Sequence, residues 1–147
     1  MNNSDAATDF GSNKLILDTH IIIWYTEGIK NLSVQQIALI EQARKNGNLY
    51  ISTISLWEIA ILASKSRIAF TLDVRDWIDR VLNIPGLKLF DLSYEILINS
   101  VFLPYYEHKD PADRFILTTA RINDSYLMSQ DEKIIDYGNK GYVKLTK

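Results

Sequence analysis

The sequence predicts an α/β fold in which a mainly parallel sheet of four to five strands carries helices on both faces. Short apolar segments such as Leu15–Leu17 run without polar interruption, which is typical of strands buried on both faces of a parallel sheet. These segments alternate with stretches of helical periodicity. Strands that alternate with helices indicate βαβ units and therefore parallel pairing.

The chain is expected to form one domain behind a short tail. The first thirteen residues are polar, small and aperiodic, so we expect residues 1–13 to be disordered and residues 14–147 to fold together. The first strand, Leu15–Leu17, leads into a short helix over His20–Tyr25. Gly28 is expected to end that helix.

Turn and capping residues place the remaining elements. Further strands are expected at Leu49–Ile51, Leu87–Leu92 and Ser125–Met128, with an edge strand over Tyr142–Leu145. Helices are expected to begin at Ser33, at Ser52 or Thr53, and at Asp73, Ser93, Asp110 and Ser129, because these residue types cap helix N-termini. Residues 67–72 are compatible with either an extended arm or a turn.

Composition excludes several classes of protein. The chain of 147 residues is long enough for one domain with a real core, and its net charge of −2 gives no overall basicity of the kind that marks nucleic-acid binders. The absence of cysteine excludes disulfides, thiolate metal sites and cysteine nucleophiles. No apolar run approaches the roughly 20 residues of a membrane helix, and no signal peptide is evident. We expect a soluble, cytoplasmic protein.

Asp18 is the first residue that needs a chemical explanation. It ends the first strand and lies between two apolar segments, where an ionised carboxylate is costly unless its charge is compensated. In open α/β folds, ligands bind just beyond the carboxyl ends of the strands, which is where Asp18 is expected.

Glu58 is the second such residue, because its neighbours on a helix are mostly apolar. Ile54, Ser55, Ile61 and Leu62 lie three and four residues away from it. A buried glutamate can be paired with one arginine or kept protonated. A cation shared with Asp18 is the simpler account, since it compensates both charges.

Asp113 and Asp131 each have a simpler structural explanation. Asp110 and Asp113 have the spacing of a capping box, and so do Ser129 and Glu132, in which case Asp131 complements the helix dipole. Asp131 nevertheless follows the fourth strand directly, at the same pole of the sheet as Asp18. The position of Asp113 at that pole is less secure from topology.

A cluster of four carboxylates is repulsive and needs a cation. Charges of one sign that lie a few ångströms apart cannot all ionise unaided. Hard divalent cations with oxygen ligands solve this problem, and Mg²⁺ or Mn²⁺ suits an all-carboxylate site. Metals held in this way promote the hydrolysis of phosphodiesters.

Four segments together resemble the PIN-domain ribonucleases, specifically the VapC-like toxins of bacterial type II toxin–antitoxin systems. The matching segments are residues 15–20 with Trp24, residues 52–60, residues 108–114 and residues 127–131. The resemblance implies a three-layer α/β/α fold and an acidic pocket that hydrolyses RNA with Mg²⁺ or Mn²⁺. It departs from the family at Ser129-Gln-Asp131, where many relatives carry Thr-Ala-Asp or Thr-Asn.

The resemblance also implies roles for the acids. By position, Asp18, Glu58 and Asp113 are similar to the family's invariant acids, and Asp131 to its more variable fourth. Asp18 and Asp113 are then expected to be metal ligands and Glu58 a ligand or a water-orienting base. Asp131 is expected to act through a water or a second metal.

Four further residues are implied as supporting groups. Thr19 and Ser129 could supply a hydroxyl near the metal, and Asp110 is expected to cap its helix. Arg114 is expected to be either a buried partner of Asp110 or a phosphate contact.

The leading hypothesis is therefore a metal-dependent endoribonuclease acting as a toxin. By analogy with the family it would form a homodimer and bind a cognate antitoxin protein. The Tyr105-Tyr106 pair could contact RNA bases or the antitoxin, or simply belong to the core.

Two alternatives are weaker. A catalytically silent PIN-like binding module would keep the acids only as helix caps, yet all four acidic positions are intact. A receiver-type signalling domain that binds Mg²⁺ would need adjacent acids after the first strand, where this chain has only Asp18.

Overall fold

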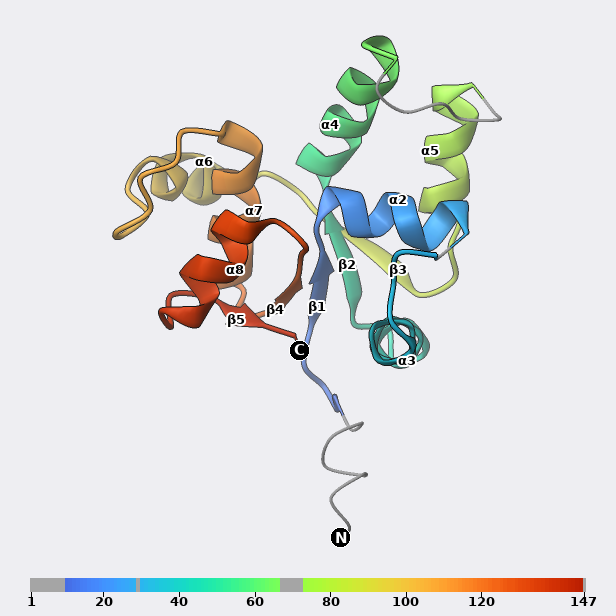
Figure 1. Ribbon diagram of the computed structural model, residues 1–147, viewed down its shortest axis with the longest axis horizontal. Coiled ribbons are helices and arrows are strands. Elements are labelled where there is room, and N and C mark those ends of the chain that lie inside the picture. The colour runs from blue at the N-terminus through green and yellow to red at the C-terminus, as the bar shows by residue number, and fades with distance from the viewer. Residues whose placement is uncertain (1–9, 29, 67–72, 147) are drawn as a thin grey trace, which may run out of the picture.

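The computed structural model describes residues 10–28, 30–66 and 73–146 and contains a single five-stranded sheet (Figure 1). The strands lie in the order β3-β2-β1-β4-β5, and every neighbouring pair is parallel. The elements along the chain are β1 (Leu15–Leu17), α2 (Thr19–Glu27), α3 (Val34–Lys45), β2 (Leu49–Ser52), α4 (Thr53–Ser64), α5 (Val74–Leu82), β3 (Leu87–Phe90), α6 (Tyr94–Val101), α7 (Pro111–Ile122), β4 (Tyr126–Met128), α8 (Glu132–Asn139) and β5 (Lys144–Leu145). The predicted α/β class with a parallel sheet is confirmed.

Two hydrophobic cores cover the two faces of the sheet. Leu15 and Leu17 of β1 belong to the core under α2, α3, α4 and α5, whereas Ile16 belongs to the core under α7 and α8. Successive side chains of a strand point to opposite faces, so a strand between two helical layers must be apolar at every position. In Figure 1 helices α2, α3 and α5 lie on one side of the sheet and α6, α7 and α8 on the other.

Most of the predicted helix starts are confirmed by capping geometry. Ser33 forms a full capping box with Gln36, and the side chains of Ser93 and Asp110 accept hydrogen bonds from the third residue of their helices. Ser52 and Asp73 cap α4 and α5 in a similar way. Each cap satisfies a backbone N–H group that the first turn leaves without a partner.

The prediction that Ser129 caps the last helix is wrong. Asp131 is the N-cap of α8, and its carboxylate accepts hydrogen bonds from the backbone N–H groups of Lys133 and Ile134. The Ser129 hydroxyl is instead drawn to Asp18, to which it donates a hydrogen bond across 111 residues of sequence. A contact from another strand of the sheet thus overrides the local capping pattern.

Two predicted segments fall partly or wholly outside the described residues. Residues 67–72 lie outside them, as do residues 1–9 of the expected tail. Phe10 is described, and its ring packs edge-on against Tyr126 with 4.9 Å between the ring centroids. No helix in the described part of the chain is long and apolar enough to cross a membrane.

The strand order also separates this fold from a receiver domain. The flavodoxin-like order of receivers is 2-1-3-4-5, whereas the order here is 3-2-1-4-5. In this arrangement the direction of winding reverses between β1 and β4. Ligands of open α/β sheets bind in the crevice at such a switch point.

Gly86 offers a test of the packing between α3 and the start of β3. Its φ is +85°, and a Cβ added there would lie 2.0 Å from the backbone carbonyl oxygen of Arg44. Gly141 has a similar φ of +89° with nothing within 4 Å of its added Cβ. We expect Gly86→Ala to lower the free energy of unfolding by at least about 2 kcal/mol more than Gly141→Ala, which meets only the left-handed backbone cost of about 1 kcal/mol. Urea denaturation of the two variants measures this difference, and equal losses would contradict the close contact.

Candidate active site

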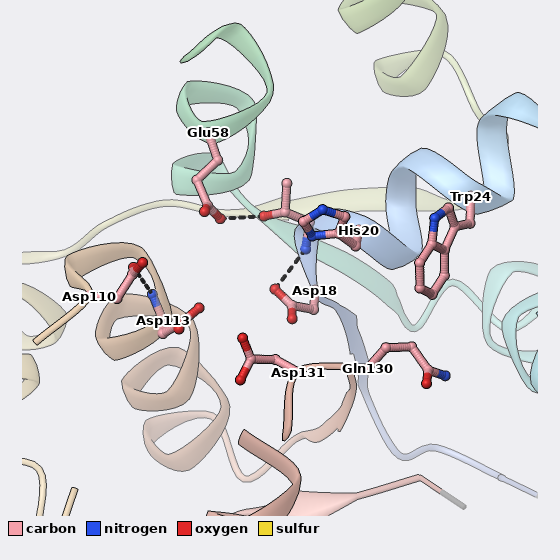
Figure 2. A pocket seen from close by; sticks show the side chains of 9 residues that line it. Asp18, His20, Trp24, Glu58, Asp110, Asp113, Gln130 and Asp131 are labelled. Carbon is pink, nitrogen blue, oxygen red and sulfur yellow. Dashed lines mark hydrogen bonds between the residues drawn. The ribbon is translucent and has the colours of Figure 1, made fainter. Parts of the chain in front are cut away.

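A cavity of about 370 Å³ opens at the carboxyl ends of β1 and β4, at the switch point of the sheet (Figure 2). Its lining consists of Asp18, Thr19, His20, Trp24, Glu58, Asp110, Asp113, Gln130 and Asp131. Five carboxylates from β1, α4, α7 and the β4–α8 connection therefore face one space. In the part of the chain that the structure describes, this lining contains no lysine or arginine.

Asp18 is the one buried carboxylate among the five that line the cavity, with 6% of its surface exposed. It caps α2, and its carboxylate accepts one hydrogen bond from the backbone N–H of Thr19 at 2.7 Å and another from the Ser129 hydroxyl at 2.6 Å. Burial raises the pKa of Asp18, and these two hydrogen bonds act in the opposite direction. The side chain is thus held firmly in one orientation.

Ser129 joins the ends of β1 and β4. Its hydroxyl donates to Asp18, and it accepts a hydrogen bond from the backbone N–H of Asp131 at 3.0 Å. This bridge fixes the two strand ends that supply Asp18 and Asp131. Ser129 supports the cavity without lining it.

Glu58 reaches the cavity from α4 and is held by Thr19. The Thr19 hydroxyl lies 2.5 Å from the Glu58 carboxylate and 2.9 Å from the Ser55 hydroxyl, and both Thr19 and Ser55 are buried. Burial, together with the negative charges of Asp18, Asp110 and Asp131, raises the pKa of Glu58 to about 7, although the hydrogen bond from Thr19 lowers it. Glu58 is therefore poised between its two protonation states near neutral pH.

Asp113 lies at the same cavity, which the sequence alone left uncertain. It occupies the first turn of α7, where its backbone N–H donates to the Asp110 carboxylate at 3.1 Å. Burial raises the pKa of Asp113 to about 8, with additional contributions from the charges of Asp110, Asp131, Asp18 and Glu58. Asp110 has the capping role that was expected and also faces the cavity (Figure 2).

The Arg114 guanidinium is occupied by backbone carbonyl groups and does not pair with Asp110, whereas the expected phosphate contact stays a prediction. It donates hydrogen bonds to the carbonyl oxygens of Ser100, Val101, Tyr106 and His108 at 2.7–3.3 Å. These bonds tie the end of α6 and the following loop to the start of α7. Arg114 thus holds the segment that carries Asp110 and Asp113, and among the described residues it forms no ion pair with either carboxylate.

Ser55 and Tyr106 are site residues whose roles the sequence did not reveal. Ser55 lies one turn before Glu58 on α4, and a hydroxyl on that apolar face was a signal that could have found it. Tyr106 is 6% exposed and belongs to the core, whereas its neighbour Tyr105 is 80% exposed. The Tyr106 hydroxyl is buried without a hydrogen-bond partner among the described residues. Burial and the charges of Asp113 and Asp131 raise its pKa.

The residue types fit a hard divalent cation. Five carboxylates share the cavity, where burial and their mutual repulsion raise the pKa values of Asp113 and Glu58, and Mg²⁺ or Mn²⁺ would relieve this repulsion. Among the described residues, no three histidine or acidic side chains converge closely enough to hold one ion between them. Mg²⁺ commonly keeps several water ligands and binds through one or two carboxylates, which a cavity of this size accommodates.

The comparisons with known proteins agree with this geometry. The PIN domain family model matches residues 15–140. Ribonuclease VapC22 of Mycobacterium tuberculosis (strain ATCC 25618 / H37Rv) is 28% identical over 120 residues, which cover 82% of this chain and 88% of the relative.

Solved structures show the same fold at low identity. VapBC2 from Rickettsia felis, bound to a DNA fragment from its promoter, has a TM-score of 0.65 at 18% identity and covers 90% of this chain and 96% of its own. A toxin–antitoxin complex from Klebsiella pneumoniae has a TM-score of 0.60 at 21% identity, with 91% and 97% covered. VapBC from Salmonella typhimurium, bound to DNA, has a TM-score of 0.65 at 16% identity, also with 91% and 97% covered.

The family model spans most of the chain, and the acidic cavity lies within the matched region. The chain belongs to the PIN domain family, within which it is similar to the VapC ribonucleases.

Proposed function

We propose that this chain is a metal-dependent endoribonuclease that hydrolyses RNA phosphodiester bonds as the toxin of a type II toxin–antitoxin pair. The observation that carries the proposal is the cavity in which five carboxylates meet at the switch point of the sheet without a lysine or arginine in the described lining. The similarity to a protein named ribonuclease VapC22 supports RNA as the substrate. Such an enzyme would work in the cytoplasm, where its substrate is found.

The proposed ligands are Asp18 and Asp113, which approach the cavity from opposite walls. A bound Mg²⁺ or Mn²⁺ would offset the charge that develops on the phosphodiester oxygens. Ser129 and the Thr19 backbone hold the Asp18 carboxylate, and Arg114 holds the segment that carries Asp113. Asp131 faces the same space and is proposed to act through a water.

Glu58 is proposed to orient the attacking water. Thr19 fixes its carboxylate, and a pKa of about 7 allows it to accept a proton from water and release it again near neutral pH. The Ser55 hydroxyl is hydrogen-bonded to the Thr19 hydroxyl at 2.9 Å and helps to hold it in place.

The proposed partners are an antitoxin protein and a second copy of the chain. The Klebsiella neighbour is a toxin–antitoxin complex, which supports the first. A second copy of the chain could bind to an apolar stripe that α6 and its C-cap expose at helical spacing. The side chains of this stripe are between 43% and 74% exposed, and they are Tyr94, Leu97, Ile98, Val101 and Phe102. A contiguous apolar face of this kind is typical of a protein interface.

Asp18→Asn is expected to lower the rate of RNA cleavage by at least about 100-fold, because it removes a charge that the cation requires. It should also weaken Mn²⁺ binding and raise the melting temperature in metal-free buffer at about pH 8, since one repelling charge is lost. Calorimetric Mn²⁺ titration and cleavage of total RNA with and without EDTA measure these effects. Asp79→Asn, on the exposed surface of α5, is the matched control.

Cleavage by Asp18→Asn at the parental rate would contradict the proposed ligand role. Parental protein that binds no Mn²⁺ and cuts no RNA would favour the catalytically silent PIN-like module instead.

The raised pKa values of Glu58 and Asp113 predict how stability depends on pH. Both folded-state values lie above the ordinary carboxyl values, so the stability they contribute is present at low pH and is lost as pH rises through about 7 and 8. We expect the melting temperature of metal-free protein to fall between roughly pH 5 and pH 8.5. Added Mn²⁺ should raise it more at the upper end of that range. A Mn²⁺ effect that is larger at low pH would contradict this assignment.

Val101→Glu tests the α6 stripe as a subunit interface. A charge placed at the centre of an apolar contact must be desolvated on association, so the variant is expected to be monomeric at concentrations where the parent is dimeric. Sedimentation velocity measures the change. Val34→Glu, on the exposed side of α3, is the control, and a dimer that persists in Val101→Glu would exclude α6 as its interface.

A further inference from the structure

A second cavity of about 300 Å³ is formed by the loop before α7 and by α8, which also contribute residues to the candidate active site. It is lined by Tyr105, Tyr106, Glu107, His108, Lys133, Asp136, Tyr137 and Lys140, and we refer to it as the tyrosine pocket. His108 lies two residues before Asp110, and Lys133 lies two residues after Asp131. The loop before α7 and the start of α8 therefore each contribute residues to both cavities.

The floor of the tyrosine pocket is aromatic and rigid. The Tyr106 ring packs edge-on against Tyr137 at 5.0 Å and against His108 at 5.1 Å. The Tyr137 hydroxyl donates to the carbonyl oxygen of Pro104 at 2.7 Å, which fixes the ring relative to the loop before α7. These rings are pre-ordered, so a ligand that packs against them would not have to immobilise them first.

Tyr105 stands apart from these buried rings. It is 80% exposed, and its φ of +58° is uncommon for a bulky residue. The Tyr142 ring, whose centroid lies 5.4 Å away, supports it from one side. The backbone thus presents a large aromatic face to solvent at the rim of the tyrosine pocket, and such backbone outliers concentrate where ligands bind.

The two cavities differ in their charges. The acidic cavity has five carboxylates, whereas the tyrosine pocket has Lys133 and Lys140 opposite Glu107 and Asp136. Lys140 pairs with Asp136 at 3.1 Å, but both side chains are more than 60% exposed, so the pair is weak. Lys133 has no carboxylate within salt-bridge distance in the described part of the chain. Its ammonium group remains available to an anion.

We propose that the tyrosine pocket binds one nucleotide of single-stranded RNA beside the bond that is cut. A base stacks on Tyr105, and Lys133 contacts the adjoining phosphate. Aromatic faces next to a lysine are the usual means of binding single-stranded nucleic acid without reading its sequence. This inference rests on the proposed ribonuclease function, because the phosphodiester at the acidic cavity must have a flanking nucleotide.

The experiment measures RNA affinity in an Asp18→Asn background, where cleavage does not interfere. The probe is a fluorescein-labelled single-stranded RNA of mixed sequence, about 12 nucleotides long, followed by fluorescence anisotropy. Tyr105→Ala is expected to raise Kd by roughly 5- to 100-fold, whereas Tyr105→Phe, which keeps the ring, should restore binding. Lys133→Gln is expected to reduce the slope of log Kd against log salt by about one, and Lys45→Gln, on exposed α3, should not change it.

A second readout uses the chain without the Asp18 substitution, in the presence of Mn²⁺. The loss caused by Tyr105→Ala should fall mainly on KM, because the residue touches a flanking nucleotide and not the reacting atoms. Cleavage by the parent combined with equal RNA affinity in all four variants would overturn the subsite and leave the ribonuclease assignment intact. If the tyrosine pocket binds a polypeptide and not RNA, the four variants would likewise have equal RNA affinity, and the subsite would be overturned. RNA binding by none of the proteins would overturn both proposals.

Discussion

The repulsion among five carboxylates at the carboxyl ends of β1 and β4 is the constraint on which the rest of this structure depends. Three of these acids also have an ordinary structural role, because Asp18, Asp110 and Asp131 each cap a helix. In the shared cavity, burial and the charges of the neighbouring acids together raise the pKa values of Glu58 and Asp113 above the ordinary range. Protons on Glu58 and Asp113, or a bound cation, relieve such a concentration of charge.

The protein holds this repulsive cluster with neutral donors. Ser129 and the backbone of Thr19 bind Asp18, the Thr19 hydroxyl binds Glu58, and backbone N–H groups of α7 and α8 bind Asp110 and Asp131. Within the described part of the chain, none of these acids forms an ion pair with a lysine or arginine. Hydrogen bonds orient the carboxylates without cancelling their charge, which preserves their attraction for a divalent cation.

The loop between α6 and α7 connects the acidic cavity with the tyrosine pocket. Arg114 anchors this loop through four carbonyl oxygens, and its guanidinium lies 5.6 Å from the centre of the Tyr106 ring. One side chain therefore positions both the acids of α7 and the aromatic floor next to them. This arrangement is the structural basis of the proposal that a flanking base binds at the tyrosine pocket.

The sequence by itself determined the succession of strands and helices along the chain, most of the helix caps, and the acids at the ends of β1 and β4. These features follow from local periodicity and from chain direction. Only the tertiary structure decided the rest. Asp113 lies at the shared cavity, and Ser129 donates a hydrogen bond to Asp18 and does not cap α8. The Arg114 guanidinium donates its hydrogen bonds to backbone carbonyl groups. These outcomes depend on contacts between residues far apart in the chain, and local sequence patterns do not show which distant residues will come into contact.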